Sequence, residues 1–139
     1  MAKKNYTQVT KLCEKYESQG LQVLIFPSNS FLQEPKGNPA IKKYILTTYK
    51  GVLHRLFSKS DVNGSKTNHV YCWLRTHCDD LKDPEHPNRA GKIPWNFAKF
   101  LVNSEGKCVS YKTGGVEPFV MEADIFETLT GEKFVKTAE

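Results

Sequence analysis

The chain has 139 residues, of which 39% are hydrophobic and 25% are charged, and its formal net charge is +5. This length fits one domain over residues 1–139 with a buried core, and the composition excludes a disordered chain. Lysine and arginine are scattered rather than clustered, so we do not expect nucleic-acid binding. No apolar run is long enough to span a bilayer, and the first five residues form no apolar signal segment.

The four cysteines, Cys13, Cys72, Cys78 and Cys108, form no Cys-x-x-Cys pair. No histidine stands beside them at ligand spacing, so we expect no zinc site, and no other metal or cofactor. Cys72 and Cys78 are six residues apart on one predicted helix, where they cannot bond to each other. We therefore predict free thiols in a reducing compartment, cytoplasmic or mitochondrial.

The first part of the chain predicts a helix followed by a strand. Residues Asn5–Gln19 are predicted to be helical and Gly20 to end the helix, with an apolar face made of Tyr6, Val9, Cys13 and Tyr16. The apolar run Leu21–Phe26 then predicts a buried strand of a parallel α/β sheet. The loop Pro27–Gly37 leaves the carboxyl end of this strand, where open α/β sheets build their sites.

Two further helices are predicted in the middle of the chain, separated by an irregular connection over Leu53–Val62. The first begins at Asn38 and buries a face made of Ile41, Tyr44, Ile45, Thr48 and Tyr49. The second runs from Thr67 or Asn68 to about Leu81 and buries Val70, Trp73, Leu74 and His77. We interpret His54, in the connection, as a surface or packing residue because no partner can be placed beside it.

The last third of the chain predicts a hairpin and a final helix. Residues Phe97–Val102 are typical of a buried strand, and the turn Asn103–Gly106 leads into a second strand, Lys107–Tyr111. We expect this antiparallel pair to share one sheet with the Leu21–Phe26 strand. A helix should then start at Pro118 and end at Gly131.

Trp95 and Asn96 are the candidate site residues, because they stand at the mouth of the Phe97–Val102 strand. An indole and an amide at that place can converge on a reacting atom. The alternative interpretation is structural: Trp95 belongs to the core and Asn96 caps a turn.

Three segments together resemble the glutathione peroxidases, which are thiol or selenol peroxidases of thioredoxin fold. Trp95-Asn-Phe97 matches the Trp-Asn-Phe motif of that family. Phe26-Pro-Ser-Asn-Ser-Phe31 followed by Gln33-Glu-Pro35 resembles its Phe-Pro-Cys-Asn-Gln-Phe…Gln-Glu-Pro stretch, and Asn5-Tyr-Thr-Gln8 resembles the start of its first helix. The resemblance implies an α/β fold, a thioredoxin-like three-layer sandwich with a mixed sheet, nearest the monomeric phospholipid-hydroperoxide type.

The resemblance also implies departures from the family. Trp95 and Asn96 correspond to two catalytic residues, but Ser30 stands at the position of the family's glutamine and Leu46 at about that of its resolving cysteine. In the family, the segment before Asn5 holds the first central strand and the peroxidatic cysteine or selenocysteine. We therefore expect an N-terminally truncated fold that lacks this strand and the nucleophile, with a vestigial site.

This comparison predicts a catalytically inactive family member that acts as a structural or assembly subunit. We expect a protein partner to complete the sheet, although the two halves of the sheet could instead shift together. The alternative is an active thiol peroxidase, reduced by glutathione or thioredoxin, that is represented here by an incomplete chain.

Overall fold

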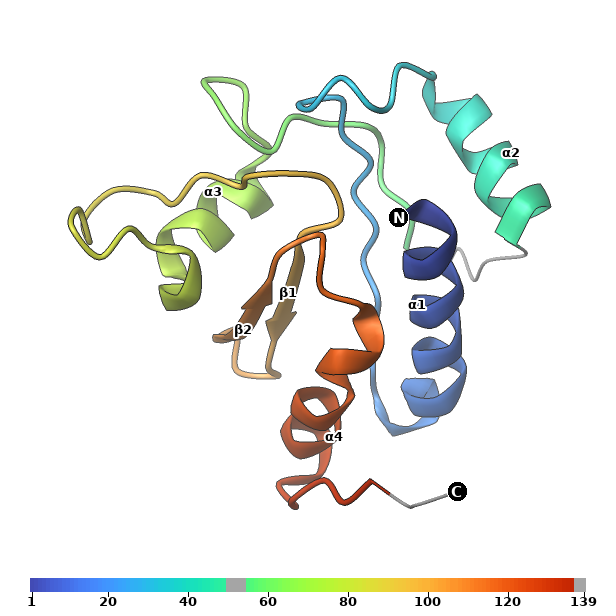
Figure 1. Ribbon diagram of the computed structural model, residues 1–139, viewed down its shortest axis with the longest axis vertical. Coiled ribbons are helices and arrows are strands. Elements are labelled where there is room, and N and C mark those ends of the chain that lie inside the picture. The colour runs from blue at the N-terminus through green and yellow to red at the C-terminus, as the bar shows by residue number, and fades with distance from the viewer. Residues whose placement is uncertain (50–54, 137–139) are drawn as a thin grey trace.

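The computed structural model describes residues 1–49 and 55–136 (Figure 1). The α-helices are α1 (Ala2–Tyr16), α2 (Asn38–Tyr49), α3 (His69–His77) and α4 (Glu122–Thr130). The 3-10 helices are η1 (Glu17–Gln19), η2 (Asp79–Leu81) and η3 (Pro118–Met121), and the strands are β1 (Lys99–Val102) and β2 (Cys108–Lys112). Every helix in the described part is too short or too polar to cross a lipid bilayer.

α1 and α4 pack together and form the main hydrophobic core. Leu12 and Tyr16, one turn apart on α1, form a buried cluster with Met121 of η3 and Ile125 of α4. The partly buried side chains around this cluster are Leu21, Leu101, Phe126 and Leu129. The Tyr16 hydroxyl donates a hydrogen bond to Glu122 Oε1 at 2.6 Å, so the one polar atom of this ring is paired.

α1 buries polar side chains as well as apolar ones. Asn5 and Gln8 are both buried, and the apolar periodicity of the sequence did not include them. Gln8 Nε2 donates to Glu117 Oε2 at 2.9 Å, and Gln8 Oε1 accepts from the backbone N of Phe119 at 2.9 Å. These bonds join α1 to the start of η3. The helical segment stops at Gly20, with a left-handed φ of 108°, as predicted.

β1 and β2 form the antiparallel hairpin that the sequence predicts. The register pairs Phe100 with Tyr111, and a shift then places Val102 opposite Cys108. The Asn103 side chain supports the turn, because its Oδ1 accepts hydrogen bonds from two turn amides at 3.1 and 2.9 Å. The final helix is also confirmed, with η3 beginning at a proline and α4 ending at a left-handed glycine.

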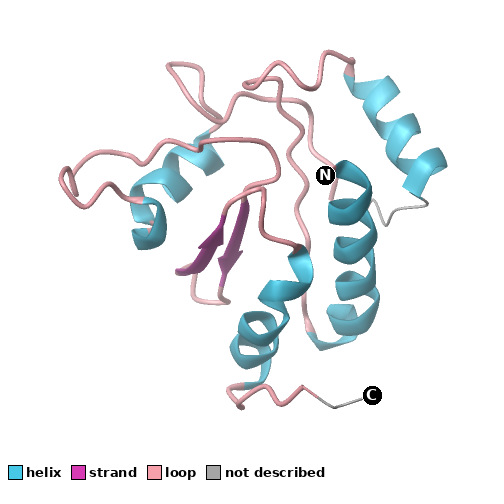
Figure 2. Ribbon diagram, in the orientation of Figure 1, coloured by secondary structure: helices cyan, strands magenta, loops and turns pink. Residues whose placement is uncertain are grey.

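The predicted strand Leu21–Phe26 is not a strand in the structure. Within this segment, Ile25 forms an isolated parallel bridge with Leu56, and its backbone N donates to Arg55 O at 2.9 Å. Figure 2 shows the segment as a loop that runs between β1 and α1. The prediction that it shares a sheet with the Phe97–Val102 strand is therefore wrong for the described residues. An apolar run favours burial, but a strand also needs a neighbouring backbone along its length.

α3 lies on the opposite face of the hairpin from α1 and α4. Successive residues of a strand point to opposite faces, so Leu101 reaches the α1–α4 core while Phe100 reaches α3. The Tyr71 ring of α3 lies 6.0 Å from the Phe100 ring and 5.3 Å from the Phe26 ring. Burial raises the pKa of the Tyr71 hydroxyl to about 12. The result is a three-layer arrangement with the hairpin and the 21–26 segment in the middle.

α2 forms where it is predicted, but its buried face is narrower. Ile41 and Ile45 are buried, whereas Tyr44 and Thr48 are exposed. The Asn38 Oδ1, at the first residue of α2, accepts a hydrogen bond from the backbone N of Lys59 at 2.8 Å. The side chain of Tyr49 and all of His54 lie outside the described residues.

α3 is shorter than predicted and buries only part of its predicted face. It ends at His77 because Cys78 is extended, with φ −86° and ψ 106°. Leu74 is buried, whereas Val70 and Trp73 face solvent, and the Trp73 ring stacks on the His77 ring at 4.7 Å. The predicted face of α3 is therefore only partly correct.

A disulfide joins Cys78 to Cys108, whose Cα atoms lie 5.3 Å apart. The prediction of free thiols is wrong for this pair and right for Cys13 and Cys72. The bonded residues are 30 positions apart, and they meet only because α3 packs across the hairpin. Sequence spacing could not reveal the pairing. Disulfides are rare in reducing compartments, so the cysteines no longer support the prediction of a reducing compartment.

Candidate functional site

Residues Trp95, Asn96 and Phe97 form a turn that leads into β1, and this turn is fixed at both ends. On the entry side, Asn63 Nδ2 donates to Ile93 O at 2.8 Å and Asn63 Oδ1 accepts from Ile93 N at 3.0 Å. On the exit side, Phe97 adopts a left-handed φ of 61°, and its ring meets the Tyr6 ring of α1 at 5.7 Å. Sequence reasoning missed Asn63, because no local pattern marks a turn asparagine that pairs with a distant backbone.

The 28–31 loop lies against this turn. The Phe31 ring is 5.5 Å from the Trp95 ring, so the predicted contact between the loop and Trp95 is present. Ser28 Oγ donates to Ser30 Oγ at 3.0 Å, and Ser30 Oγ accepts from the backbone N of Val62 at 3.1 Å. The Ser30 hydroxyl is therefore bonded within the scaffold. Trp95 remains 47% exposed, so the structural interpretation of Trp95 as a core residue is wrong.

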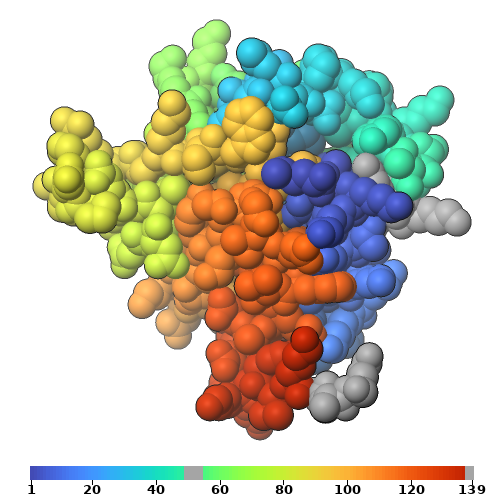
Figure 3. Space-filling view, in the orientation of Figure 1, coloured from blue at the N-terminus to red at the C-terminus, as the bar shows by residue number. Residues whose placement is uncertain are grey.

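Asn96 lies near the amino end of α1. A side chain at Gly114 would collide with the backbone carbonyl of Asn96 and would lie 3.7 Å from the sulfur of Met1. Figure 3 shows the gold segment around residues 92–98 between the cyan 28–35 region, the dark blue start of α1 and the orange residues that follow β2. The three segments that carry the predicted site therefore meet on one face of the molecule.

A cavity of about 260 Å³ opens at the same end of α1. It is lined by Met1, Lys4, Asn5 and residues 114–117. Asn5 is only 5% exposed; its Nδ2 donates to Met1 O at 3.0 Å, while its Oδ1 has no partner in the described structure. The cavity thus lies close to Asn96, and a buried oxygen without a partner among the described residues belongs to one of its lining residues.

The four cysteines are not among the residues of this turn, of the 28–31 loop or of the cavity lining. Cys13 is buried on α1, about 18 Å along the helix from Met1 at roughly 1.5 Å per residue. Burial, assisted by Glu17 and Glu14, raises the pKa of the Cys13 thiol, which disfavours the reactive thiolate. Cys72 is exposed on α3, where its Sγ contacts Thr67 O at 3.6 Å. The remaining two cysteines are bonded to each other.

Burial also affects a cation next to the turn. The Lys99 ammonium donates a hydrogen bond to Phe97 O at 2.7 Å, and burial lowers the pKa of Lys99 to about 8. Within β1, Lys99 stands opposite Lys112, so its cross-strand partner carries the same charge. The Lys99 side chain therefore loses its positive charge at a lower pH than an ordinary lysine does.

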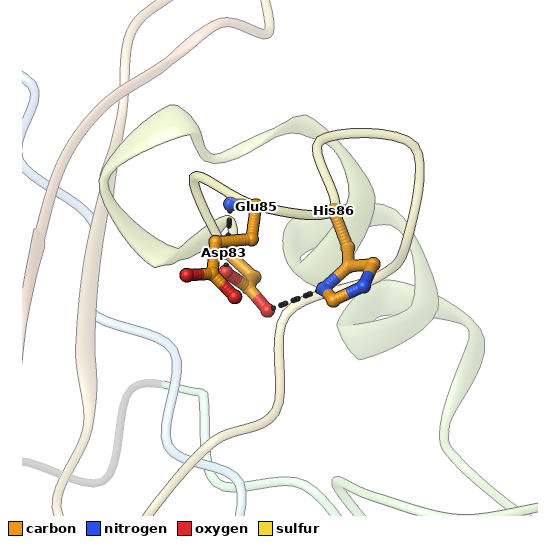
Figure 4. A group of neighbouring side chains, drawn as sticks. All are labelled: Asp83, Glu85 and His86. Carbon is orange, nitrogen blue, oxygen red and sulfur yellow. Dashed lines mark hydrogen bonds and ion pairs between the residues drawn. The ribbon is translucent and has the colours of Figure 1, made fainter.

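Asp83, Glu85 and His86 form a cluster in the loop after η2 (Figure 4). All three side chains are exposed. Asp83 Oδ1 accepts from the backbone N of Glu85 at 2.9 Å, and Asp83 Oδ2 pairs with His86 Nδ1 at 2.9 Å. The bond from His86 lowers the pKa of Asp83. These interactions are those of a capped surface turn.

The chain is similar to known glutathione peroxidases. The family profile described as glutathione peroxidase matches residues 1–75. Phospholipid hydroperoxide glutathione peroxidase 1, chloroplastic, of Arabidopsis thaliana is 37% identical over 126 residues, covering 90% of this chain and 50% of that protein. Probable phospholipid hydroperoxide glutathione peroxidase 6, mitochondrial, of the same plant is 36% identical over 126 residues, covering 90% and 51%. The chain spans about half the length of these curated relatives.

Solved structures agree with the sequence relatives. The crystal structure of T. cruzi GPX1 superimposes with a TM-score of 0.66 at 27% identity, covering 93% of this chain and 73% of that one. The predicted fold class is therefore confirmed as α/β and thioredoxin-like. Because the profile matches more than half of the residues and the predicted motifs meet in space, this chain belongs to the glutathione peroxidase family.

Proposed function

We propose that residues 1–139 form a single domain that does not reduce hydroperoxides by itself and serves as a structural subunit. This proposal is carried by one observation: the candidate site residues lie together, but none of the cysteines is among them. Trp95, Asn96 and the 28–31 loop lie together, but the four cysteines are buried, remote or bonded to each other. Thiol-dependent peroxide reduction requires a thiolate or selenolate that attacks the O–O bond. Trp95 and Asn96 are vestigial in this proposal.

The alternative is an active thiol peroxidase in which a longer natural chain supplies the nucleophile ahead of residue 1. It is favoured by the preserved contact between Phe31 and Trp95 and by the cavity at the amino end of α1. The two Arabidopsis thaliana phospholipid hydroperoxide glutathione peroxidases compared above are about twice as long as this chain. In that form, the reductant would be glutathione or thioredoxin.

A peroxidase assay separates the two proposals. Purified chain 1–139 with hydrogen peroxide and either glutathione or thioredoxin should show turnover no higher than free cysteine, because no thiolate stands at the site. The same chain alkylated with iodoacetamide is the control. Turnover that disappears on alkylation of one thiol would contradict the proposal and identify the nucleophile. A longer natural product that carries a thiol before residue 1 should turn over if the alternative is correct.

The proposed subunit role includes a protein partner that adds a strand beside β1. Among the described residues, β1 pairs with β2 on one side, and the 21–26 segment makes a bridge at Ile25. Each buried backbone group left unpaired costs about 1–3 kcal/mol. An added strand would satisfy the free edge of β1 and cover the 21–26 segment, which is a common mode of recognition.

This strand-addition proposal predicts that the isolated chain self-associates or aggregates, because an open sheet edge templates further pairing. Val102→Lys in β1 should reduce association measured by light scattering. Val120→Lys in η3, an exposed position outside the hairpin, is the control and should leave the association unchanged. A monomer that unfolds cooperatively well above ambient temperature would argue against a partner.

We place the protein in the cytoplasm or the mitochondrion in this proposal. One relative is named mitochondrial and another chloroplastic. This location requires that the fold shield the Cys78–Cys108 disulfide, because a disulfide persists among reducing thiols only if it is shielded.

A further inference from the structure

The Cys78–Cys108 disulfide closes a covalent loop around the candidate site. Cys78 directly follows α3 and Cys108 is the first residue of β2. The chain between them contains the 82–91 loop, the Trp95–Asn96 turn and β1. The Cα separation of 5.3 Å is within the usual range for a disulfide. The oxidation state of this pair therefore decides whether the site segment is tethered at both ends.

The hairpin packs against the α1–α4 core on one face and against α3 on the other, and the disulfide adds a covalent link to the contact with α3. A two-stranded sheet is marginal alone and needs packing against other elements. The hairpin meets α3 through the Phe100 and Tyr71 rings, and the register shift next to Cys108 interrupts its ladder. On the other side, Arg75 of α3 donates from Nε to Gly91 O at 2.6 Å, which holds the start of the site segment. The disulfide adds a covalent link between the end of α3 and β2, beside the interruption of the ladder.

We propose that Cys78 and Cys108 form a redox-controlled crosslink that holds α3 to the hairpin and sets the stability of the fold and of the Trp95–Asn96 turn. A low-molecular-weight disulfide such as oxidised glutathione is a suitable oxidant for forming the crosslink. One cysteine thiolate attacks it, releases one glutathione and forms a mixed disulfide, and the second thiolate displaces the other glutathione. Two electrons pass to glutathione, and the two displaced glutathione thiolates take up the two cysteine protons, so the products are the protein disulfide and two molecules of reduced glutathione. A dithiol reverses the reaction and becomes oxidised itself.

Burial makes the formed crosslink resistant to reduction in the native state. Cys78 is only 1% exposed, and Cys108 is partly buried. A thiolate must approach a sulfur along the S–S axis, and the departing thiolate must be stabilised. Attack at Cys108 would leave the Cys78 thiolate in an apolar interior, which is unfavourable. The fold therefore shields the bond, and reduction requires local opening.

Peptide mass mapping tests whether the bond forms in the full chain. The protein is equilibrated in a glutathione buffer that contains both redox forms, denatured and treated with iodoacetamide before and after reduction. Cys13 and Cys72 should be alkylated at once, and Cys78 and Cys108 only after reduction. Alkylation of all four before reduction would overturn the proposal.

Thermal unfolding tests the consequence of the crosslink. Reduction of the wild-type chain should lower Tm by about 10 °C or more, as expected for a disulfide that closes a loop of this length. The Cys78→Ser/Cys108→Ser variant should have the lower Tm and no response to reductant, while Cys72→Ser should respond like wild type. An unchanged Tm on reduction would refute the stabilising role.

The rate at which the Cys78–Cys108 bond is reduced provides a test that uses only the wild-type chain. Dithiothreitol should reduce the wild-type bond slowly under native conditions and rapidly in urea. Equal rates in the two conditions would show that the fold does not shield the bond.

Discussion

Tyr16→Ala should lower the free energy of unfolding by about 3–5 kcal/mol, the range measured for large-to-small substitutions of buried aromatic residues. Tyr16 is almost fully buried between α1 and α4, where it packs with Leu12, Met121 and Ile125. Its removal leaves a cavity in the main core, and Glu122 loses the hydroxyl that donates to it at 2.6 Å. Urea denaturation followed by circular dichroism measures the change.

Tyr16→Phe is the matched control because it keeps the ring and removes the hydroxyl. We expect it to cost about 1.5–3 kcal/mol, the usual range for a hydrogen bond to a charged group, because the acceptor is the Glu122 carboxylate. If Tyr16→Ala were no more destabilising than Tyr16→Phe, the α1–α4 cluster would not be the main core.

Asn63→Ala should lower the free energy of unfolding by about 2–4 kcal/mol, because it leaves two backbone groups without partners. Asn63 bonds both the N–H and the C=O of Ile93, and Ile93 is almost completely buried. A buried backbone group without a partner costs about 1–3 kcal/mol. The variant should also change the fluorescence of Trp95, which stands two residues after Ile93. Urea denaturation and the fluorescence of Trp73→Phe variants with and without Asn63→Ala measure the two effects.

Asn88→Ala is the control for this prediction, since Asn88 is exposed in the 82–91 loop. It should change stability by less than about 0.5 kcal/mol, as surface substitutions usually do. Equal stabilities of Asn63→Ala and Asn88→Ala would show that Asn63 does not hold the site turn.

The position of Asn63 shows why the site could be predicted only in part. The Trp95-Asn-Phe97 motif and the Phe26–Phe31 segment are each an unbroken run of residues, so their resemblance to the family can be recognised from the sequence. The structure brings Phe31 to Trp95. The residue that fixes the entry to the turn is 30 positions away from Ile93. A side chain that bonds a distant backbone leaves no periodic or local pattern.

The sequence by itself determined the elements whose causes are local. Glycine in a left-handed conformation ends the first helical segment at Gly20 and α4 at Gly131, and a turn asparagine, Asn103, closes the hairpin. Each of these depends on the conformational preference or hydrogen bonds of residues within one turn. The composition and motif order also determined the fold class and the family.

Only the tertiary structure decided the features that depend on which segments meet. Leu21–Phe26 has the composition of a strand, yet it makes an isolated bridge because a strand forms only where another backbone lies beside it. Val70 and Trp73 were predicted to be buried with Leu74, but they face solvent, because tertiary contacts select which residues of α3 turn inward. Cys78 and Cys108 bond because α3 crosses the hairpin and brings their Cα atoms to 5.3 Å, a distance that 30 intervening steps of sequence do not specify.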